Sequence, residues 1–139
     1  MTLRKIYLAA ALLFSSLSYA ADPALIASNH PILGVWKWTT PNAGCSELYN
    51  FKANNRLGFA SGAEVGESLY TVSAEPSPKG YYRIENTVAS DNGSNDCRGQ
   101  PGQSGMHSTL FARFSPDGKQ VKMCFGESDD QCFGPLTRE

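Results

Sequence analysis

The four cysteines carry the clearest chemistry in this sequence. Cys45, Cys97, Cys124 and Cys132 are even in number, and the cysteines of an exported chain oxidise by default to disulfides. None of their spacings is the close two-residue kind that zinc ribbons use, which argues against a four-cysteine zinc site. We favour the pairing of Cys124 with Cys132, since they flank the turn of the last expected hairpin, and this leaves Cys45 to hold Cys97. The sequence therefore predicts disulfides and no metal site.

Groups able to act as a nucleophile or a base are scarce. The only histidines are His30 and His107, and with the cysteines oxidised there is little from which to build a Ser-His-Asp or Cys-His arrangement. We expect both histidine side chains at the surface. The oxygen-rich residues 91 to 96 lack the spacing of a calcium-binding EF-hand, so a solvated turn is expected there. We predict no enzymatic activity, no catalytic residues and no cofactor.

The start of the chain has the three-part layout of a secretory signal peptide. Arg4 and Lys5 precede the apolar run from Ile6 to Phe14, and small residues ending at Ala20 form an Ala-x-Ala-like cleavage site. The apolar run is shorter than the roughly 18 to 20 residues that anchor a helix in a bilayer. We expect a periplasmic or secreted protein without a membrane anchor, with a signal peptide at 1–20, a lead segment at 21–32 and a β-barrel domain at 33–139.

Charge and size narrow the possible partners. The 139 residues include 12 Lys and Arg against 13 Asp and Glu, and loss of Arg4 and Lys5 with the signal peptide brings the net charge to −3. Nucleic acids favour clustered basic residues, and this sequence has no run of like charges. We therefore exclude nucleic acid as a partner and expect a monomer with a single core.

Short runs rich in Tyr, Phe, Val, Ile and Thr alternate with turn residues through the rest of the chain. The one plausible helical turn is Asp22 to Pro31, because a proline could start it and another would stop it. Most connections are hairpin-sized, as at Pro116-Asp117-Gly118. The prediction is an all-β antiparallel meander with strands at 33–39, 45–52, 56–61, 67–74, 80–89, 107–114, 119–125 and 131–135.

The alternation of apolar and polar residues predicts which face of each strand points inward. One buried face per strand fits a closed barrel or a sandwich, and eight up-and-down strands can close without an exposed edge. Glu47 shares the inward face with Tyr49, where a carboxylate needs a partner. It is either a polar anchor for a ligand, a rim residue or the partner of an arginine. The other expected inward residues are Phe51, Leu57, Phe59, Tyr70, Val72, Tyr82, Ile84, Val88, Val121, Met123 and Phe125.

Gly34-Val35-Trp36, at the start of the first expected strand, resembles the Gly-x-Trp signature of the lipocalins and their calycin relatives. The resemblance implies an eight-stranded meander barrel with Trp36 at its closed base and an arginine, which would be Arg113, packed against it. It also implies an exported, non-catalytic protein that binds a small apolar or amphipathic ligand. The candidate ligand-binding residues are Trp38, Glu47, Tyr49, Tyr70 and Tyr82.

The segment from Ser90 to Met106 suggests a different function. It is rich in glycine and polar residues and has almost nothing apolar to bury, and a loop of this length in a compact domain is functional or mobile. Cys97 in its middle would tie it to the body of the protein. The alternative hypothesis is an interaction module, such as an inhibitor or immunity-type partner of an envelope enzyme, that uses this loop. The partner is thus a small apolar molecule or an envelope protein.

Overall fold

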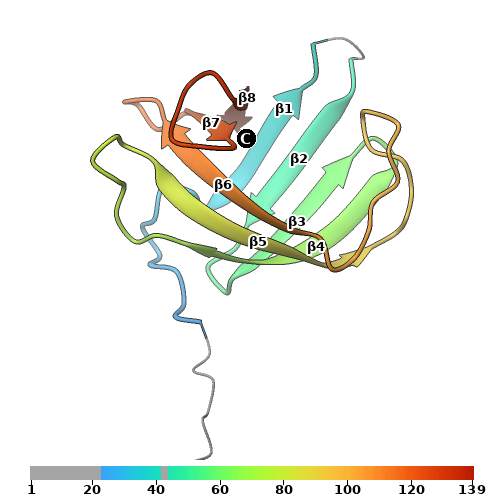
Figure 1. The fold of residues 1–139 in the computed structure, drawn as a ribbon, viewed down its shortest axis with the longest axis horizontal. Helices are drawn as coiled ribbons and strands as arrows, with labels where there is room; N and C mark the ends of the chain where they lie inside the picture. Colours follow the sequence, from blue (N-terminus) through green and yellow to red (C-terminus); the bar gives the residue numbers. More distant parts are fainter. Residues whose placement is uncertain (1–22, 42–43) are drawn as a thin grey trace, which may run out of the picture.

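The computed structural model describes residues 23–41 and 44–139, so the expected signal peptide lies outside the described residues. The described chain forms a closed antiparallel barrel whose strands follow one another in sequence order (Figure 1). The predicted fold class is confirmed, as a barrel rather than a sandwich. The strands are β1 (Gly34–Thr39), β2 (Ser46–Phe51), β3 (Arg56–Ser61), β4 (Glu64–Val72), β5 (Tyr82–Asp91), β6 (His107–Phe114), β7 (Gln120–Cys124) and β8 (Cys132–Arg138).

Three strands, β4, β5 and β8, extend beyond their predicted ends. β4 begins at Glu64 because Gly62, with a φ of 61°, turns the chain directly after β3. β8 continues past Pro135, and pairing of its last residues with β1 closes the barrel. Pro135 does not end the strand because the register of β7 and β8 shifts at this point and leaves the proline outside the ladder.

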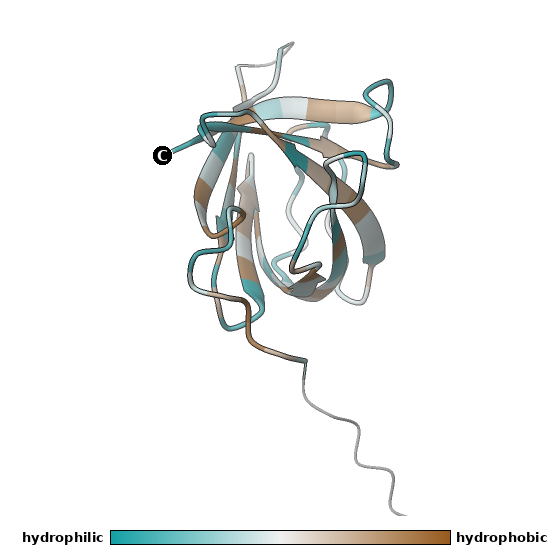
Figure 2. Ribbon diagram, turned by 90° about the vertical axis from the view of Figure 1, so that its left-hand side faces the viewer, coloured by the Kyte–Doolittle hydropathy of each residue, from teal (hydrophilic) through white to brown (hydrophobic). Residues whose placement is uncertain are grey.

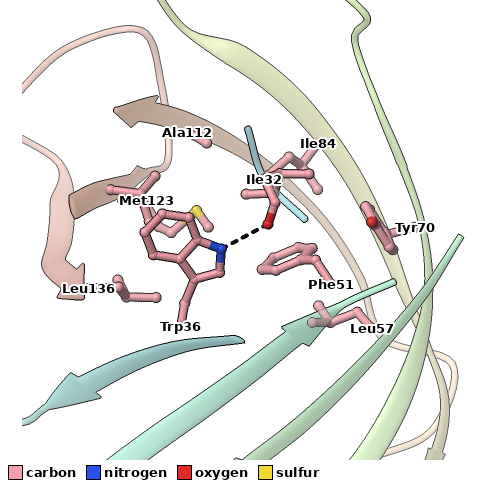
Figure 3. Close-up of a cluster of buried hydrophobic side chains, with 10 residues drawn as sticks. Ile32, Trp36, Phe51, Leu57, Tyr70, Ile84, Ala112, Met123 and Leu136 are labelled. Carbon is pink, nitrogen blue, oxygen red and sulfur yellow. Dashed lines mark hydrogen bonds between the residues drawn. The ribbon is translucent and has the colours of Figure 1, made fainter. Parts of the chain in front are cut away.

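The inward faces of the strands form the core. Figure 2 shows hydrophobic and hydrophilic residues alternating along the strands, as a barrel with an apolar interior requires. Phe125, which was expected to point inward, is 61% exposed, because β7 ends at Cys124 and the alternation stops there. The buried cluster, most of it labelled in Figure 3, comprises Ile32, Trp36, Phe51, Leu57, Tyr70, Ile84, Ala112, Val121, Met123 and Leu136.

One end of the barrel, which we call the base, is closed around Trp36. Its indole N–H donates a hydrogen bond of 2.8 Å to the Ile32 carbonyl oxygen (Figure 3), and both residues are fully buried. The guanidinium of Arg138 lies 4.2 Å from the centre of the indole. The prediction that Arg113 packs on this tryptophan is wrong, because Arg113 lies over Tyr81 and bonds to Asp129 instead. The arginine at the base comes from β8.

The segment before β1 folds under the base without forming the expected helical turn. Two successive tight turns replace a helix, since the backbone N–H of His30 bonds to Ala27 and that of Leu33 bonds to His30. His30 is buried rather than solvated. One of its ring nitrogens lies 3.0 Å from the Ser73 carbonyl oxygen and the other accepts a bond from the Ile32 N–H. This segment therefore seals the base.

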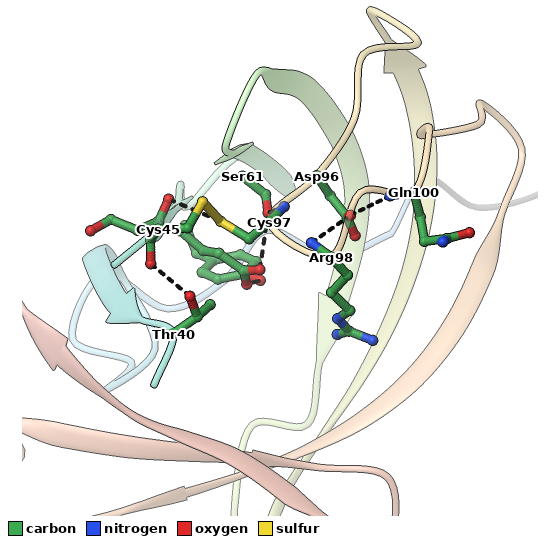
Figure 4. The surroundings of a disulfide bond; sticks show 10 residues. Thr40, Cys45, Ser61, Asp96, Cys97, Arg98 and Gln100 are labelled. Carbon is green, nitrogen blue, oxygen red and sulfur yellow. Dashed lines mark hydrogen bonds between the residues drawn. A yellow bond between two sulfur atoms is a disulfide. The ribbon is translucent and has the colours of Figure 1, made fainter. Parts of the chain in front are cut away.

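Both predicted disulfides are present, and they lie at the opposite end of the barrel, which we call the mouth. Cys124 pairs with Cys132 across the β7–β8 hairpin, and Cys45 pairs with Cys97 in the β5–β6 loop (Figure 4). With separations of 52 and 8 residues, loop closure contributes about 4 kcal/mol and about 2–3 kcal/mol, respectively, to stability. The long loop at the mouth is thus held against the start of β2.

Candidate ligand cavity inside the barrel

A cavity of about 200 Å³ lies inside the barrel above the packed base. An apolar cavity of about 150 Å³ is large enough to take up benzene, so this one has room for a slightly larger organic molecule. The lining residues come from β2 to β8 and from the loop at the mouth. They are Tyr49, Phe51, Leu57, Phe59, Glu64, Ser68, Ile84, Asn86, Val88, Asp91, Gly102, Gln103, Met106, Leu110, Met123, Phe133 and Leu136.

Two side-chain oxygen atoms of residues in the cavity wall lack hydrogen-bond partners among the described residues. Ser68 on β4 is fully buried and its hydroxyl is unpaired, and the side-chain oxygen of Asn86 on β5 is also buried and unpaired. A buried polar atom without a partner costs about 1–3 kcal/mol. Both atoms belong to residues that line the cavity, so a bound molecule could satisfy them.

A pair of carboxylates, Glu64 and Asp91, lines the mouth side of the same wall. The two residues lie on adjacent strands, where Gly66 pairs with Asp91. Burial and the neighbouring Asp91 carboxylate, with smaller contributions from Asp96 and Glu47, raise the pKa of Glu64 to about 7. At neutral pH Glu64 is therefore about half ionised.

A β-bulge places Asp91 in the cavity. Ser68 pairs with Val88, whereas Glu67 pairs with Ser90, so β5 contains one extra residue, Ala89, at this point. An extra residue reverses the alternation beyond it. Val88 and Asp91 consequently both line the cavity, while Ser90 is exposed.

Glu47 faces inward as predicted and is 3% exposed, but hydroxyl groups surround it rather than an arginine. The Tyr49 hydroxyl donates to one carboxylate oxygen at 2.5 Å, and the Ser61 hydroxyl donates to the other at 2.9 Å. The Ser61 oxygen in turn accepts the backbone N–H of Cys97 at 3.0 Å. Burial and the carboxylate raise the pKa of Tyr49 well above its usual range. This network fixes the long loop to the end of β3.

Of the candidate ligand-binding residues, Tyr49 lines the cavity and the others do not. Trp38 packs against Phe133, with ring centres 5.3 Å apart, beside the cavity rather than in its wall. Tyr70 points into the core, and its hydroxyl donates to the Lys52 carbonyl at 2.9 Å. Tyr82 packs against His30 near the base. These aromatic residues belong to the core around the cavity. The packed base fills more of the barrel than the alternation of inward and outward residues alone predicts.

The loop from 92 to 106 forms part of the cavity wall, although the sequence suggested a separate recognition element. Gly102, Gln103 and Met106 line the cavity at its mouth. The backbone of Gly102 lies against the Asp91 carboxylate, since a Cβ at this position would come within 2.1 Å of it.

The other polar lining residues were not predicted from the sequence. Ser68 and Asn86 share the inward alternation of their strands, which could have identified them. Glu64, in contrast, lies before the expected start of its strand, and the inward position of Asp91 depends on the bulge.

Comparisons with protein-family models, with curated proteins and with solved structures found no match to this chain. Among the described residues, no three His, Cys, Asp or Glu side chains are grouped so that they could hold a metal ion. The same residues include no helix with the length and hydrophobicity needed to cross a bilayer. The cavity is therefore the feature from which function is argued.

Proposed function

We propose that this protein is an exported, lipocalin-like binding protein that takes a small apolar or amphipathic molecule into its barrel. The observation that carries the proposal is the cavity of about 200 Å³, whose wall is mostly apolar. Ile32 and Trp36 seal the base, so a ligand enters at the mouth. The two disulfides fit an oxidising environment outside the cytoplasm.

The geometry around Gly34 supports the lipocalin-like assignment. Gly34 has a φ of 120°, and a Cβ there would lie 2.8 Å from the guanidinium of Arg138. A larger residue would keep Arg138 from the carbonyl oxygens of Pro31 and Leu33, to which it donates bonds of 2.7 Å. The glycine and the tryptophan of Gly-x-Trp thus serve one contact, in which an arginine covers the indole and ties the lead segment to the barrel.

A titration with 1-hexanol followed by methyl NMR tests the proposal. Binding in the cavity should shift the methyl signals of Ile84, Leu110 and Leu136, which line it. The exposed Leu69 on the outer face should not move. Shifts that are absent, or that are equal on both faces, would contradict binding in the barrel.

Two matched variants separate occupation of the cavity from general surface effects. Val88→Trp places a large ring in the cavity, whereas Val65→Trp adds the same ring on the outer face, where Val65 is 56% exposed. Hexanol binding should be lost in Val88→Trp and kept in Val65→Trp, provided that circular dichroism shows both variants folded. Equal affinities would count against the cavity as the binding site.

A second candidate function, recognition of an envelope protein, is favoured by the order of the long loop. The Asp96 carboxylate accepts the backbone N–H groups of Arg98 and Gln100, both at 2.8 Å, while both side chains remain exposed (Figure 4). Native mass spectrometry of the protein purified from its host tests this candidate. A stoichiometric protein complex that is lost in an Arg98→Ala, Gln100→Ala double variant would favour it, and a co-purifying adduct of a few hundred daltons would favour the cavity.

A further inference from the structure

Four polar side chains of the cavity are gathered on one wall. Glu64 and Ser68 come from β4, and Asn86 and Asp91 come from β5, which pairs with β4 along its length. The facing wall, built by β7 and β8, contributes the apolar side chains of Met123, Phe133 and Leu136. A molecule in the cavity therefore meets hydrocarbon on one side and a group of oxygen atoms on the other.

These oxygen atoms define the chemistry of the group that they would bind. Carboxylates and a side-chain amide oxygen accept hydrogen bonds, and a serine hydroxyl both accepts and donates. Of the residues that the structure describes, no lysine, arginine or histidine lines the cavity, so the wall has a negative charge without a basic residue in it to balance it. Asp91 accepts the Gly93 N–H at 2.7 Å through one oxygen, and its carboxylate also lies within hydrogen-bonding range of Glu64, so a donor placed here would meet both carboxyl groups.

We propose that the ligand of this cavity is a small primary amine with an apolar body. Its ammonium group lies between Glu64 and Asp91, with the unpaired oxygens of Ser68 and Asn86 deeper along the same wall. Its hydrocarbon part contacts Met123 and Leu136. The inference depends on the proposed function, because it names the class of ligand for the same cavity.

Electrostatics favour an ammonium group over the alternatives. A buried cation is stabilised only when it is paired and its N–H groups find acceptors, and this wall supplies both conditions. A carboxylic acid of the same size would place a second negative charge beside Glu64 and Asp91. An alcohol has one donor and brings no positive charge, whereas an ammonium group has three donors and can bond to both carboxylates at once.

Three probes with six carbon atoms each test the inference by isothermal titration calorimetry at a pH above 7, where Glu64 is ionised. Hexylamine should bind about tenfold or more tightly than 1-hexanol, as one charge-assisted hydrogen bond predicts, and hexanoate should bind least. The Glu64→Gln, Asp91→Asn double variant keeps the size of both side chains. It should lose the preference for the amine, so that hexylamine and 1-hexanol bind to it with affinities within about twofold of each other.

Glu67→Gln is the matched control for charge. Glu67 lies on the same strand but pairs with Arg56 outside the cavity, so this variant should retain the wild-type preference. Should the double variant fail to fold, Glu64→Gln alone should weaken the preference, and the ranking of the three probes on the wild-type protein remains a test.

Several results would overturn the inference. Equal binding of hexylamine and 1-hexanol by the wild-type protein, a preference for hexanoate, or an amine preference that survives in the double variant would each refute an ammonium site. Those three results would leave the proposed function standing, because a small molecule would still be bound. Failure of the wild-type protein to bind any of the probes would overturn both.

Discussion

Removal of the Tyr49 hydroxyl should destabilise the barrel by about 2 kcal/mol. The Tyr49→Phe variant deletes a hydrogen bond of 2.5 Å to the Glu47 carboxylate, which is 3% exposed and would keep one side-chain donor, Ser61, at 2.9 Å. Hydrogen bonds to charged groups contribute about 1.5–3 kcal/mol, and a buried carboxylate that loses a donor has no water to replace it.

Tyr70→Phe is the matched control, because it makes the same chemical change at another buried tyrosine. The Tyr70 hydroxyl donates to the neutral carbonyl oxygen of Lys52 at 2.9 Å, and a bond between neutral groups contributes about 1 kcal/mol. The charge of the acceptor is the main difference between the two variants. We therefore expect Tyr49→Phe to cost about 1 kcal/mol more than Tyr70→Phe.

Urea denaturation of the oxidised protein at pH 7 measures this difference. With a slope of about 1.5 kcal/mol per molar urea, the midpoint should fall by about 1.3 M in Tyr49→Phe and by about 0.7 M in Tyr70→Phe. The slopes should be unchanged, since neither variant alters the surface exposed on unfolding. A Tyr49→Phe midpoint at or above that of Tyr70→Phe would refute the view that Glu47 is a buried, ionised acceptor held by hydroxyl groups.

Three further predictions concern other parts of the barrel. Gly66→Ala should lower stability by about 2–3 kcal/mol, because its Cβ would lie 2.3 Å from the Phe59 ring, whereas Gly58→Ala, with no atom closer than 4.0 Å, should be nearly neutral; equal thermal midpoints would contradict this. The free energy of unfolding of the wild-type protein, relative to that of Glu64→Gln, should fall as the pH rises from about 4.5 to about 7. Over this range the Glu64 carboxyl keeps a proton in the folded state that it releases in the unfolded chain. A difference in stability that urea titrations find constant with pH would refute this prediction. Arg138→Ala should lower stability by about 1–2 kcal/mol and speed hydrogen exchange in the lead segment, because it loses two bonds of 2.7 Å to backbone carbonyls. Arg138→Lys should recover only part of this loss. Unchanged hydrogen exchange would show that the arginine does not hold the lead segment.

The fold was predictable because its signals are local. Alternation within each strand, turn residues between strands and the positions of the four cysteines each depend on short stretches of sequence. They led to the strand order and to both disulfides. The arginine at the base could not be assigned in the same way, because Arg113 and Arg138 both lie on late strands and only the path of the closed barrel brings Arg138 over Trp36.

The cavity was harder to predict than the barrel around it. The alternation of inward and outward residues correctly placed Glu47 and Tyr49 inside the barrel. It could not distinguish the packed base from the open upper part, so Tyr70 was expected in a binding site but lies in the core. Asp91 was expected in a solvated turn. It lines the cavity because the bulge at Ala89 changes the parity of β5, and a bulge has no reliable signal in a single sequence.

That bulge controls the chemistry at the mouth through the pairing of β5 with β4. With the bulge at Ala89, the carboxylate of Asp91 reaches the interior and the hydroxyl of Ser90 faces solvent. If the same residues paired with β4 without a bulge, Ser90 would face the interior and Asp91 would face solvent, and the acidic position would become a neutral one with no side chain substituted. A change that removes or moves the bulge, rather than a substitution in the cavity wall, is then a short evolutionary route by which a barrel of this design could change its class of ligand.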